Sequence, residues 1–492
     1  MTMTTAGPTA GRHLPSPRNT RWALAVTSLA LFMATLDNLV VTMALPAIRG
    51  SLHASVQSLE WTVNAYTLTF AVLLLTGAAL GDRYGRRRMF VIGLAVFTAA
   101  SAAAALSPDT GMLIAARAVQ GAGAAIVLPL TLTLLSEATP PQRRGMALGI
   151  WSGVSGLGVA LGPLAGGAVV QGLDWHWIFW INVPVGVTLL PLASKRLAES
   201  RGPSRRLDIP GLGLAGAGLL GVTYAVIRGQ ELGWTSAGIL APMAAGVAGL
   251  AAFAWWEAKS DAPMLPMRFF RSRAFSAANA VSLAMYFGVF GSIFLLAQFL
   301  QTAQGYSPLA AGLRTLPWTA MPIIVAPLAG ILSDRIGSRP LLAAGLALQA
   351  TAIAWLAVIL SPGVSYTLLV VPFALAGTGM AMVFAPAANA VLAAVAPAEA
   401  GQASGATNAI RELGGVLGIA ILASVFSAHG SYATPSSFAA GLTAALPVGA
   451  AFLAAGAVIA LLVPRRLDRS SHFRVPDGPD KGHQKREPAA ML

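Results

Sequence analysis

The feature that most constrains this chain is a series of fourteen apolar stretches, each long enough to cross a lipid bilayer as a helix. Such a helix needs about 20 mostly apolar residues. Of the 492 residues, 56% are hydrophobic and only 10% are charged, whereas soluble domains carry about 25% charged residues. We therefore predict an all-α polytopic membrane protein with spans at approximately 22–46, 58–80, 88–106, 111–135, 146–170, 176–194, 209–228, 236–256, 276–300, 310–332, 340–360, 366–394, 404–428 and 440–463.

The placement of Lys and Arg predicts the orientation. If the amino terminus lies in the cytoplasm, 27 of the 32 Lys and Arg residues fall in cytoplasmic segments and 2 in outer loops. This excess is typical of cytoplasmic loops, so both termini are expected there, and the first stretch is expected to be a retained span. The net charge of +14 then reflects topology and attraction to anionic membrane lipid, and no nucleic-acid partner is expected.

A short motif occurs twice and predicts an internal repeat. Residues 82–87 and 334–339 both read D-R-x-G-x-R, and both follow a span on the cytoplasmic side. Loops on the same side indicate parallel repeats, which in transporters enclose a cavity and rock against each other; two coincidental basic loops are the alternative. We expect a cytoplasmic tail at 1–21, a six-helix bundle at 22–200, two inserted spans at 201–273, a second six-helix bundle at 274–464 and a cytoplasmic tail at 465–492.

Several motifs resemble those of the major facilitator superfamily, and in particular its fourteen-span drug:proton antiporter branch, the EmrB/QacA-like exporters. They are the loop G-A-A-L-G-D-R-Y-G-R-R-R at 77–88, L-I-A-A-R-A-V-Q-G-A-G at 113–123, G-V-A-L-G-P-L-A-G-G at 158–167, L-D-N at 36–38 with A-L-P at 44–46, and W-H-W-I-F-W-I-N-V-P at 175–184. Two positions depart from the branch pattern: His176 replaces an Arg, and Asn38-Leu39 replaces a small residue followed by Thr.

The resemblance implies the major facilitator fold and efflux of drugs or antibiotics by alternating access in the bacterial cell membrane. The expected partners are a small amphipathic or cationic drug-like substrate, protons and membrane lipid, and the chain is expected to be a monomer. A facilitator or importer of a small metabolite is the alternative, and a membrane enzyme or lipid-handling scaffold is a third possibility. The sequence has no cysteine, no P-loop and no H-E-x-x-H motif, so no cofactor or metal is expected, and an ion gradient or the substrate gradient must drive transport. The resemblance implies that the proton gradient is the one used.

Charged residues inside spans are rare and mark candidate coupling sites, because burying one costs about 3 kcal/mol. The candidates for proton coupling are Asp37, Glu412 and Arg117, at positions that the resemblance links to proton transfer and cation binding. For Asp37, the alternative to proton coupling is a purely structural hydrogen-bonding role. Arg411 offers Glu412 a neighbouring charge, and Gln120 lies one helical turn from Arg117. Glu60, at the outer end of its span, is expected to be wet.

Two glycine-rich motifs are candidates for gating. A carboxylate at a helix carboxyl terminus is unfavourable alone, so Asp82 needs neighbouring arginines or another helix, and the loop could latch the inner gate or merely fix topology. Glycines four residues apart let helices approach closely, and Pro163 favours a kink; plain packing is the alternative. The gating loop comprises Gly77, Gly81, Asp82, Arg83, Gly85, Arg86 and Arg87, and the antiporter motif comprises Gly158, Gly162, Pro163, Gly166 and Gly167.

Aromatic residues on two spans are candidates for a substrate cavity. Trp61 and Tyr66 lie on one span, and Tyr286, Phe287 and Phe290 lie on another. Aromatic faces bind organic cations, although packing in the core is an alternative for all five. The tryptophans at 175, 177 and 180 are expected to lie at the membrane boundary.

Overall fold

A computed structural model describes residues 17–140, 144–201, 207–395 and 399–464, and every regular element in these ranges is a helix. The elements are α1 (Pro17–Leu52), α2 (Val56–Tyr84), α3 (Arg86–Ala105), α4 (Thr110–Glu137), α5 (Arg144–Gly172), α6 (Trp177–Trp180), α7 (Asn182–Arg196), α8 (Ile209–Leu232), α9 (Ala237–Lys259), the 3-10 helix η2 (Met267–Arg271), α10 (Arg273–Thr302), α11 (Pro308–Thr319), α12 (Met321–Ile336), α13 (Ser338–Ile359), α14 (Tyr366–Ala393), α15 (Ala400–His429) and α16 (Pro435–Ala460).

Local sequence signals set many of the helix ends. Ser55 and Asp109 cap α2 and α4 by accepting hydrogen bonds from backbone N–H groups at Ser58 and Met112, as short polar side chains do at helix starts. Between α2 and α3 the chain turns at Gly85, whose φ of 108° suits glycine because no Cβ obstructs it.

Twelve helical segments in the described ranges are long and apolar enough to cross a membrane, or thirteen if α2, bent by 50° between Leu74 and Thr76, counts as one span. The fourteen expected stretches are therefore not all reproduced by this criterion. The expected span at 146–170 lies within α5, a 29-residue helix outside the twelve. Two expected spans are each built from two helices, α6 with α7 and α11 with α12. The chain is a multi-pass membrane protein.

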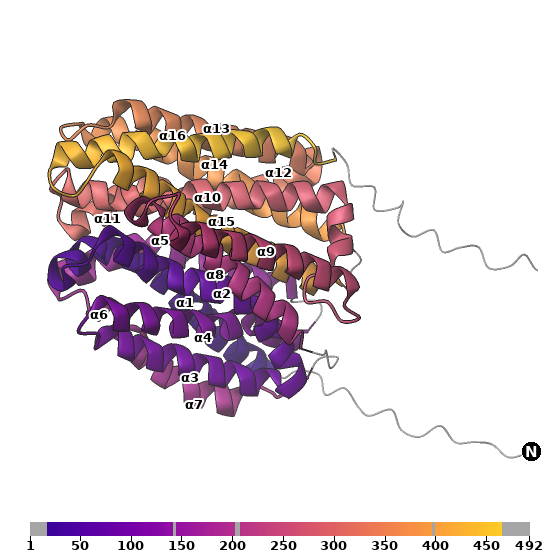
Figure 1. Ribbon diagram of the computed structural model, residues 1–492. Coiled ribbons are helices and arrows are strands. Elements are labelled where there is room, and N and C mark those ends of the chain that lie inside the picture. Colours follow the sequence, from indigo (N-terminus) through magenta and orange to yellow (C-terminus); the bar gives the residue numbers. More distant parts are fainter. Residues whose placement is uncertain (1–16, 141–143, 202–206, 396–398, 465–492) are drawn as a thin grey trace, which may run out of the picture.

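The helices form two groups that lie side by side (Figure 1). One core joins α1, α2, α3, α4 and α7 through residues such as Phe90 and Phe97, and a larger core centres on α10, α13, α14, α15 and α16. The helix α8, which pairs with α9, contacts both groups. Val226 and Ile227 of α8 pack against Ala420 of α15, and a side chain at Gly216 would meet Val72 of α2.

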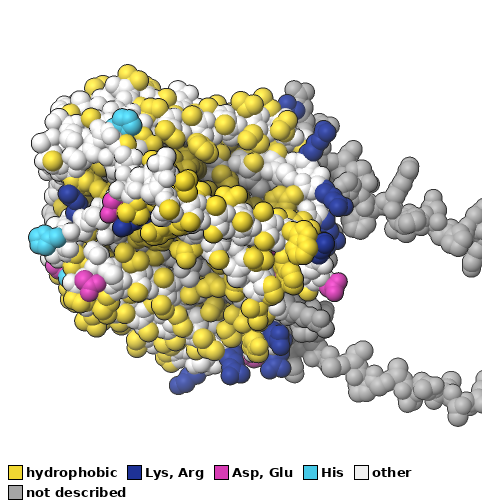
Figure 2. Space-filling model, in the orientation of Figure 1, with side chains coloured by type: hydrophobic (Ala, Val, Ile, Leu, Met, Phe, Trp, Pro, Cys, Tyr) yellow, Lys and Arg dark blue, Asp and Glu magenta, His cyan; other side chains and the backbone are white. Residues whose placement is uncertain are grey.

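The two ends of the molecule differ in charge. The helix α1 begins and α16 ends at one end, where most of the visible Lys and Arg side chains gather (Figure 2). We call it the basic end, and the end that holds the α1–α2 turn the opposite end. At the basic end Arg86, Arg87 and Arg268 form ion pairs. The distribution agrees with the charge pattern that predicts a cytoplasmic face.

Candidate functional site

A fully buried ion pair lies within the first group of helices. Arg117 of α4 places Nη1 2.6 Å from Oδ2 of Asp37 on α1, and each side chain is 1% exposed. Attraction between opposite charges is strong where water is excluded, but removal from water offsets it unless further hydrogen bonds are made. The pair therefore needs polar neighbours to be stable.

Three neutral side chains supply those hydrogen bonds. Gln120 donates to Asp37 Oδ1 at 2.8 Å and accepts from Arg117 Nη1 at 2.6 Å. Asn182 of α7 donates to the same Asp37 oxygen at 2.6 Å. Ser101 of α3 accepts from both amides, at 2.8 and 3.4 Å. Four helices thus meet at one buried polar cluster, in which the Asp37 carboxylate accepts from three donors.

Arg117 also contacts the backbone and two aromatic rings. Its Nε donates to the carbonyl of Thr62 at 3.2 Å, and its guanidinium lies 4.2 Å from the centre of the Tyr66 ring and 5.8 Å from that of Phe179. Such cation–π contacts stabilise a buried guanidinium. Tyr66 is therefore a wall of the ion-pair cluster, and it also lies within electrostatic range of Glu412 on α15.

The charges on α15 are arranged differently. Arg411 and Glu412 form no ion pair within 4.0 Å among the described residues, although Arg411 is close enough to act on the Glu412 carboxyl electrostatically. The Nε and Nη2 atoms of Arg411 and the Oε2 atom of Glu412 are buried without a hydrogen-bond partner in this part of the chain. Arg411 lies 6.0 Å from the ring centres of both Tyr286 and Phe384. The remaining Nη1 atom donates to Asn408 Oδ1 at 3.5 Å. Buried polar atoms without partners are costly, and a ligand or proton that satisfies them recovers that cost.

The predicted cavity aromatics occupy several environments. Tyr286 stacks on Phe290 at 5.2 Å and meets Phe384 edge-on at 6.1 Å, beside Arg411. Phe287 is 1% exposed and stacks on Phe452 of α16 at 3.9 Å, so it packs in the core. Trp61 packs against the α8–α15 contact.

The gating loop is tied to its own group of helices. Asp82 accepts from Arg86 at 2.6 Å, Arg86 also pairs with Glu137 at the end of α4, and Arg87 lies 3.6 Å from Glu199 beyond α7. The Arg83 guanidinium lies 5.4 Å from the Tyr84 ring. Side chains at Gly77 or Gly81 would meet α4 at Ala125 or Leu130. These contacts of the loop thus join α2, α3, α4 and the end of α7. The side chain of Asp334, its partner in the repeat, lies outside the residues that the structure describes.

The glycines of α5 allow close packing against two neighbouring helices. Cβ atoms at Gly158, Gly162 and Gly166 would meet α1 at Thr35, Leu39 and Val40. Gly167 lies instead against the backbone of Pro308 on α11, and the backbone of Pro163 lies against Gly312 on the same helix. The motif therefore packs α5 on α1 within one group and on α11 across the two groups.

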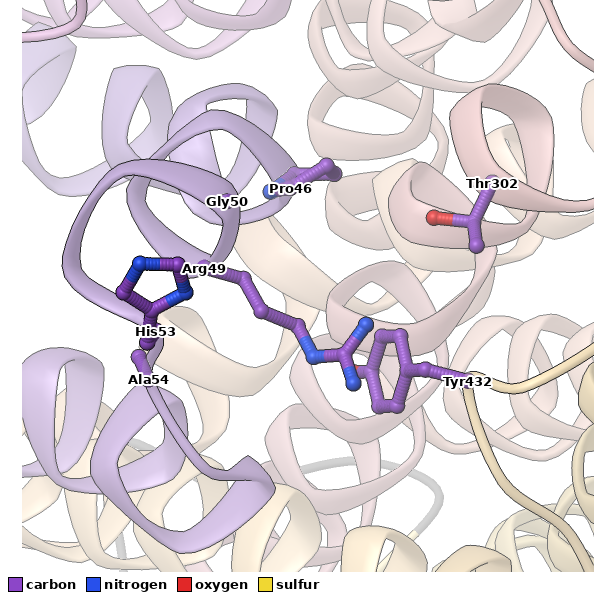
Figure 3. A pocket seen from close by; sticks show the side chains of 7 residues that line it. All are labelled: Pro46, Arg49, Gly50, His53, Ala54, Thr302 and Tyr432. Carbon is purple, nitrogen blue, oxygen red and sulfur yellow. The ribbon is translucent and has the colours of Figure 1, made fainter.

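A second polar site, which the sequence reasoning missed, lies at the opposite end. A cavity of about 480 Å³ is lined by Arg49, His53, Thr302 and Tyr432, together with Pro46, Gly50 and Ala54 (Figure 3). The Arg49 guanidinium lies 4.0 Å from the centre of the Tyr432 ring. Because Arg49 belongs to α1 and Tyr432 to the α15–α16 turn, this contact joins the two groups of helices.

Glu60 lies near this site, and its surroundings correct an expectation. Its side chain was expected to be wet, but it is 1% exposed because α2 packs between α1, α4, α8 and α15. Its Oε2 atom has no hydrogen-bond partner in the part of the chain that the structure describes. Asn182 and Arg49 were not among the predicted site residues. Two sequence signals could have found them: Asn182 lies inside the motif at 175–184, and Arg49 is one of only two cations expected in the outer loops.

Comparisons with known proteins identify the same family on several grounds. The model of the Major Facilitator Superfamily matches residues 27–419 and 278–477. The multidrug resistance protein Stp of Mycobacterium tuberculosis (strain CDC 1551 / Oshkosh) is 38% identical over 407 residues, which are 82% of this chain and 75% of that protein. The tetracenomycin C resistance and export protein of Streptomyces glaucescens is 35% identical, over 84% of this chain and 78% of its own. The cephamycin export protein CmcT of Amycolatopsis lactamdurans is 37% identical, over 90% and 92%.

Solved structures share the fold at low identity. A bacterial homologue of the human lysosomal transporter Spinster aligns with a TM-score of 0.66 at 17% identity, covering 91% of this chain and 97% of that one. The POT family transporter PepTSo aligns with a TM-score of 0.68 at 15% identity, covering 93% of this chain and 100% of that one.

Proposed function

The chain belongs to the Major Facilitator Superfamily, and from that premise we propose that it exports small amphipathic or cationic drug-like compounds in exchange for protons. It is a transporter and not an enzyme. Relatives covering more than four fifths of this chain are named for multidrug resistance, antibiotic resistance or export. These shared names are the observation from which we infer that the direction of transport is export.

Proton coupling is proposed from the buried charges. Asp37 and Arg117 lie in one group of helices, Arg411 and Glu412 lie in the other, and Tyr66 is within electrostatic range of Asp37, Arg117 and Glu412. Protonation of either carboxyl changes the net charge between the groups by one unit. Because electrostatic interactions are strong at low dielectric, that change biases how the groups pack and how a charged substrate binds.

The substrate is proposed to bind beside Tyr286, Phe290 and Phe384. The rings of Tyr286 and Phe384 lie 6.0 Å from Arg411, whose guanidinium keeps two nitrogen atoms unpartnered among the described residues, and Phe290 stacks on Tyr286. Aromatic walls with a few polar groups suit drug-sized ligands. The unpartnered Oε2 of Glu412 would favour a cationic substrate.

The contacts between the groups support alternating access with the opposite end closed in this conformation. There, Arg49 lies over Tyr432, Gln301 of α10 donates to the carbonyl of Met43 on α1 at 3.0 Å, and the amide of Leu309 donates to Gln171 on α5 at 3.2 Å. Rocking the groups apart at this end would break these contacts, open the opposite end and close the basic end, as expected for parallel repeats.

The proposed topology has fourteen spans in a bacterial plasma membrane. Bundles at 22–200 and 274–464 would flank two inserted spans within 201–273, with both termini in the cytoplasm and the opposite end outside. The transporter is proposed to work as a monomer in lipid, without a cofactor. One proton moving through 100 mV supplies about 2.3 kcal/mol, enough for a gradient of roughly 50-fold.

Transport by purified protein in liposomes tests the proposal. With ethidium as the probe substrate and an imposed ΔpH, exchange predicts concentrative ethidium transport and an ethidium-dependent loss of the ΔpH. A facilitator would equilibrate the probe without moving protons. An importer would move ethidium and protons in the same direction. Either result would overturn proton-coupled export.

A further inference from the structure

Glu60 is a second buried acid whose surroundings contrast with those of Asp37. The Asp37 carboxylate accepts hydrogen bonds from Arg117, Gln120 and Asn182. Glu60 is equally buried, yet its Oε2 has no hydrogen-bond partner among the described residues. A buried carboxylate without a partner is costly, so Glu60 differs from Asp37 in the hydrogen bonds that would stabilise its charge.

The groups around Glu60 explain why it lacks a counter-ion. Arg49 of α1 and Glu60 each lie within electrostatic range of Tyr432. The Arg49 guanidinium lies over the Tyr432 ring, and no ion pair within 4.0 Å joins it to Glu60 in the described part of the chain. On the other helices against α2, Arg117 pairs with Asp37 and Arg228 pairs with Glu231 at 3.3 Å. Other charged groups on these elements lie further away along the helices: Arg21 near the start of α1, Glu137 at the end of α4 in a pair with Arg86, Arg411 and Glu412 further along α15, and His429 at the end of α15. His53 lies in the turn before α2.

Tyr432 is fixed in place as the alternative partner of Arg49. Its hydroxyl donates to Oε1 of the buried Gln298 at 2.5 Å. Burial raises the pKa of Tyr432, and the neighbouring Arg49 guanidinium acts in the opposite direction. The phenol therefore remains protonated at physiological pH and offers Arg49 a neutral aromatic face.

The cavity in Figure 3 lies at the seam between the two groups of helices. Arg49 and His53 come from the first group, and Thr302 and Tyr432 come from the second. Separation of the groups at this end would lift Tyr432 away from Arg49 and extend the cavity toward the first turns of α2, where Glu60 lies. Water would then reach the carboxyl, and Arg49 would be free to pair with it.

We propose that Glu60 is the residue that takes up a proton from the outside, and that Arg49 alternates between Tyr432 in the closed state and ionised Glu60 in the open state. With the outer end open, Glu60 is an anion paired with Arg49. A hydronium ion from outside transfers one proton to the carboxylate, which becomes neutral and releases Arg49 to Tyr432, and the outer end closes. This assignment rests on the proposed proton exchange. It specifies which residue takes up the proton and from which side of the membrane.

The test measures ethidium transport in liposomes while the pH facing the cavity is varied and the pH on the basic side is held constant. For one coupled proton, wild-type accumulation changes about tenfold per pH unit. We expect Glu60→Gln to lose this dependence while ethidium counterflow continues, and Glu60→Asp to retain it. Glu231→Gln, which alters an acid paired at the same end, should behave as wild type.

A second variant keeps the proposal testable if Glu60→Gln is poorly folded. Arg49→Gln removes the partner of ionised Glu60, so proton uptake should be favoured and the midpoint of the outer pH dependence should move to higher pH. An unchanged midpoint, or a Glu60→Gln protein with wild-type pH dependence, would overturn the assignment. A wild-type protein that moves ethidium without protons would instead overturn the proposed exchange.

Discussion

Arg117 and Asp37 come from α4 and α1 and form an ion pair of 2.6 Å in which each side chain is 1% exposed. Both residues were candidates for proton coupling, and because they form an ion pair they cannot act independently. A charge change at Asp37 must therefore alter the surroundings of Arg117, Gln120 and Asn182 together. Hydrogen-bond networks of this kind respond as a whole when one member changes.

Asp37→Asn is expected to abolish concentrative efflux driven by ΔpH. The amide keeps the shape of the carboxyl but leaves Arg117 without a buried counter-charge, and it cannot be ionised in the transport cycle. Substrate should still equilibrate down its own gradient, which counterflow in liposomes measures. Asp109→Asn is the matched control, because Asp109 caps α4 at Met112 and asparagine caps equally well. Full concentrative efflux by Asp37→Asn would contradict the prediction.

Arg117→Leu is expected to destabilise the protein by about 3–5 kcal/mol, because it leaves the Asp37 carboxylate buried without its cation. The thermal unfolding midpoint in detergent should fall accordingly. Combining it with Asp37→Asn should restore part of the loss, since the stranded charge is removed as well. Additive losses in the double variant would show that the two residues do not act as a pair.

Asp82→Asn is expected to reduce transport strongly while expression and membrane insertion stay near those of the wild type. Arg86 would lose its partner on α2 but keep Glu137 on α4, so the loop should remain folded in its group of helices. Glu137→Gln removes the other acid and serves as the comparison. Wild-type ethidium efflux by Asp82→Asn would leave the loop with a topological role alone.

Gly167→Ala is expected to disfavour the state that is closed at the opposite end. The added methyl group would meet the backbone of Pro308 on α11, and overpacking of this kind costs about 1–3 kcal/mol. A cysteine at Thr302, in a chain that otherwise has none, should then react faster with an impermeant maleimide. Gly153→Ala is the control, since nothing lies within 4 Å of its Cβ position. Equal labelling rates in the two variants would argue against a seam role for Gly167.

The topology is tested with two single cysteines. Ser470→Cys should be protected from an impermeant maleimide in intact cells and should react once the cells are opened. Gly363→Cys should react in intact cells. Gly363 lies in the turn between α13 and α14, and nothing lies within 4 Å of its Cβ position. The reverse pattern would invert the orientation assigned from the charges.

The sequence was sufficient for the fold class because membrane spans are encoded locally. Each apolar stretch must satisfy its own backbone hydrogen bonds in lipid, so its length and composition predict a helix without knowledge of its neighbours. The stretches at 276–300 and 366–394, for example, correspond to α10 and α14. The motifs at 77–88 and 158–167 were likewise sufficient for the family.

Tertiary structure decided which charges meet. Asp37 and Arg117 lie 80 residues apart in sequence, and nothing local indicates that α1 and α4 bring them together or that Asn182 completes the cluster. Burial of Glu60 likewise depends on helices distant in sequence, which is why its position at a helix end suggested a wet side chain. Composition and spacing can identify a costly buried charge, but only the packing of helices determines whether that charge is given a partner, as at Asp37, or left without one, as at Glu60.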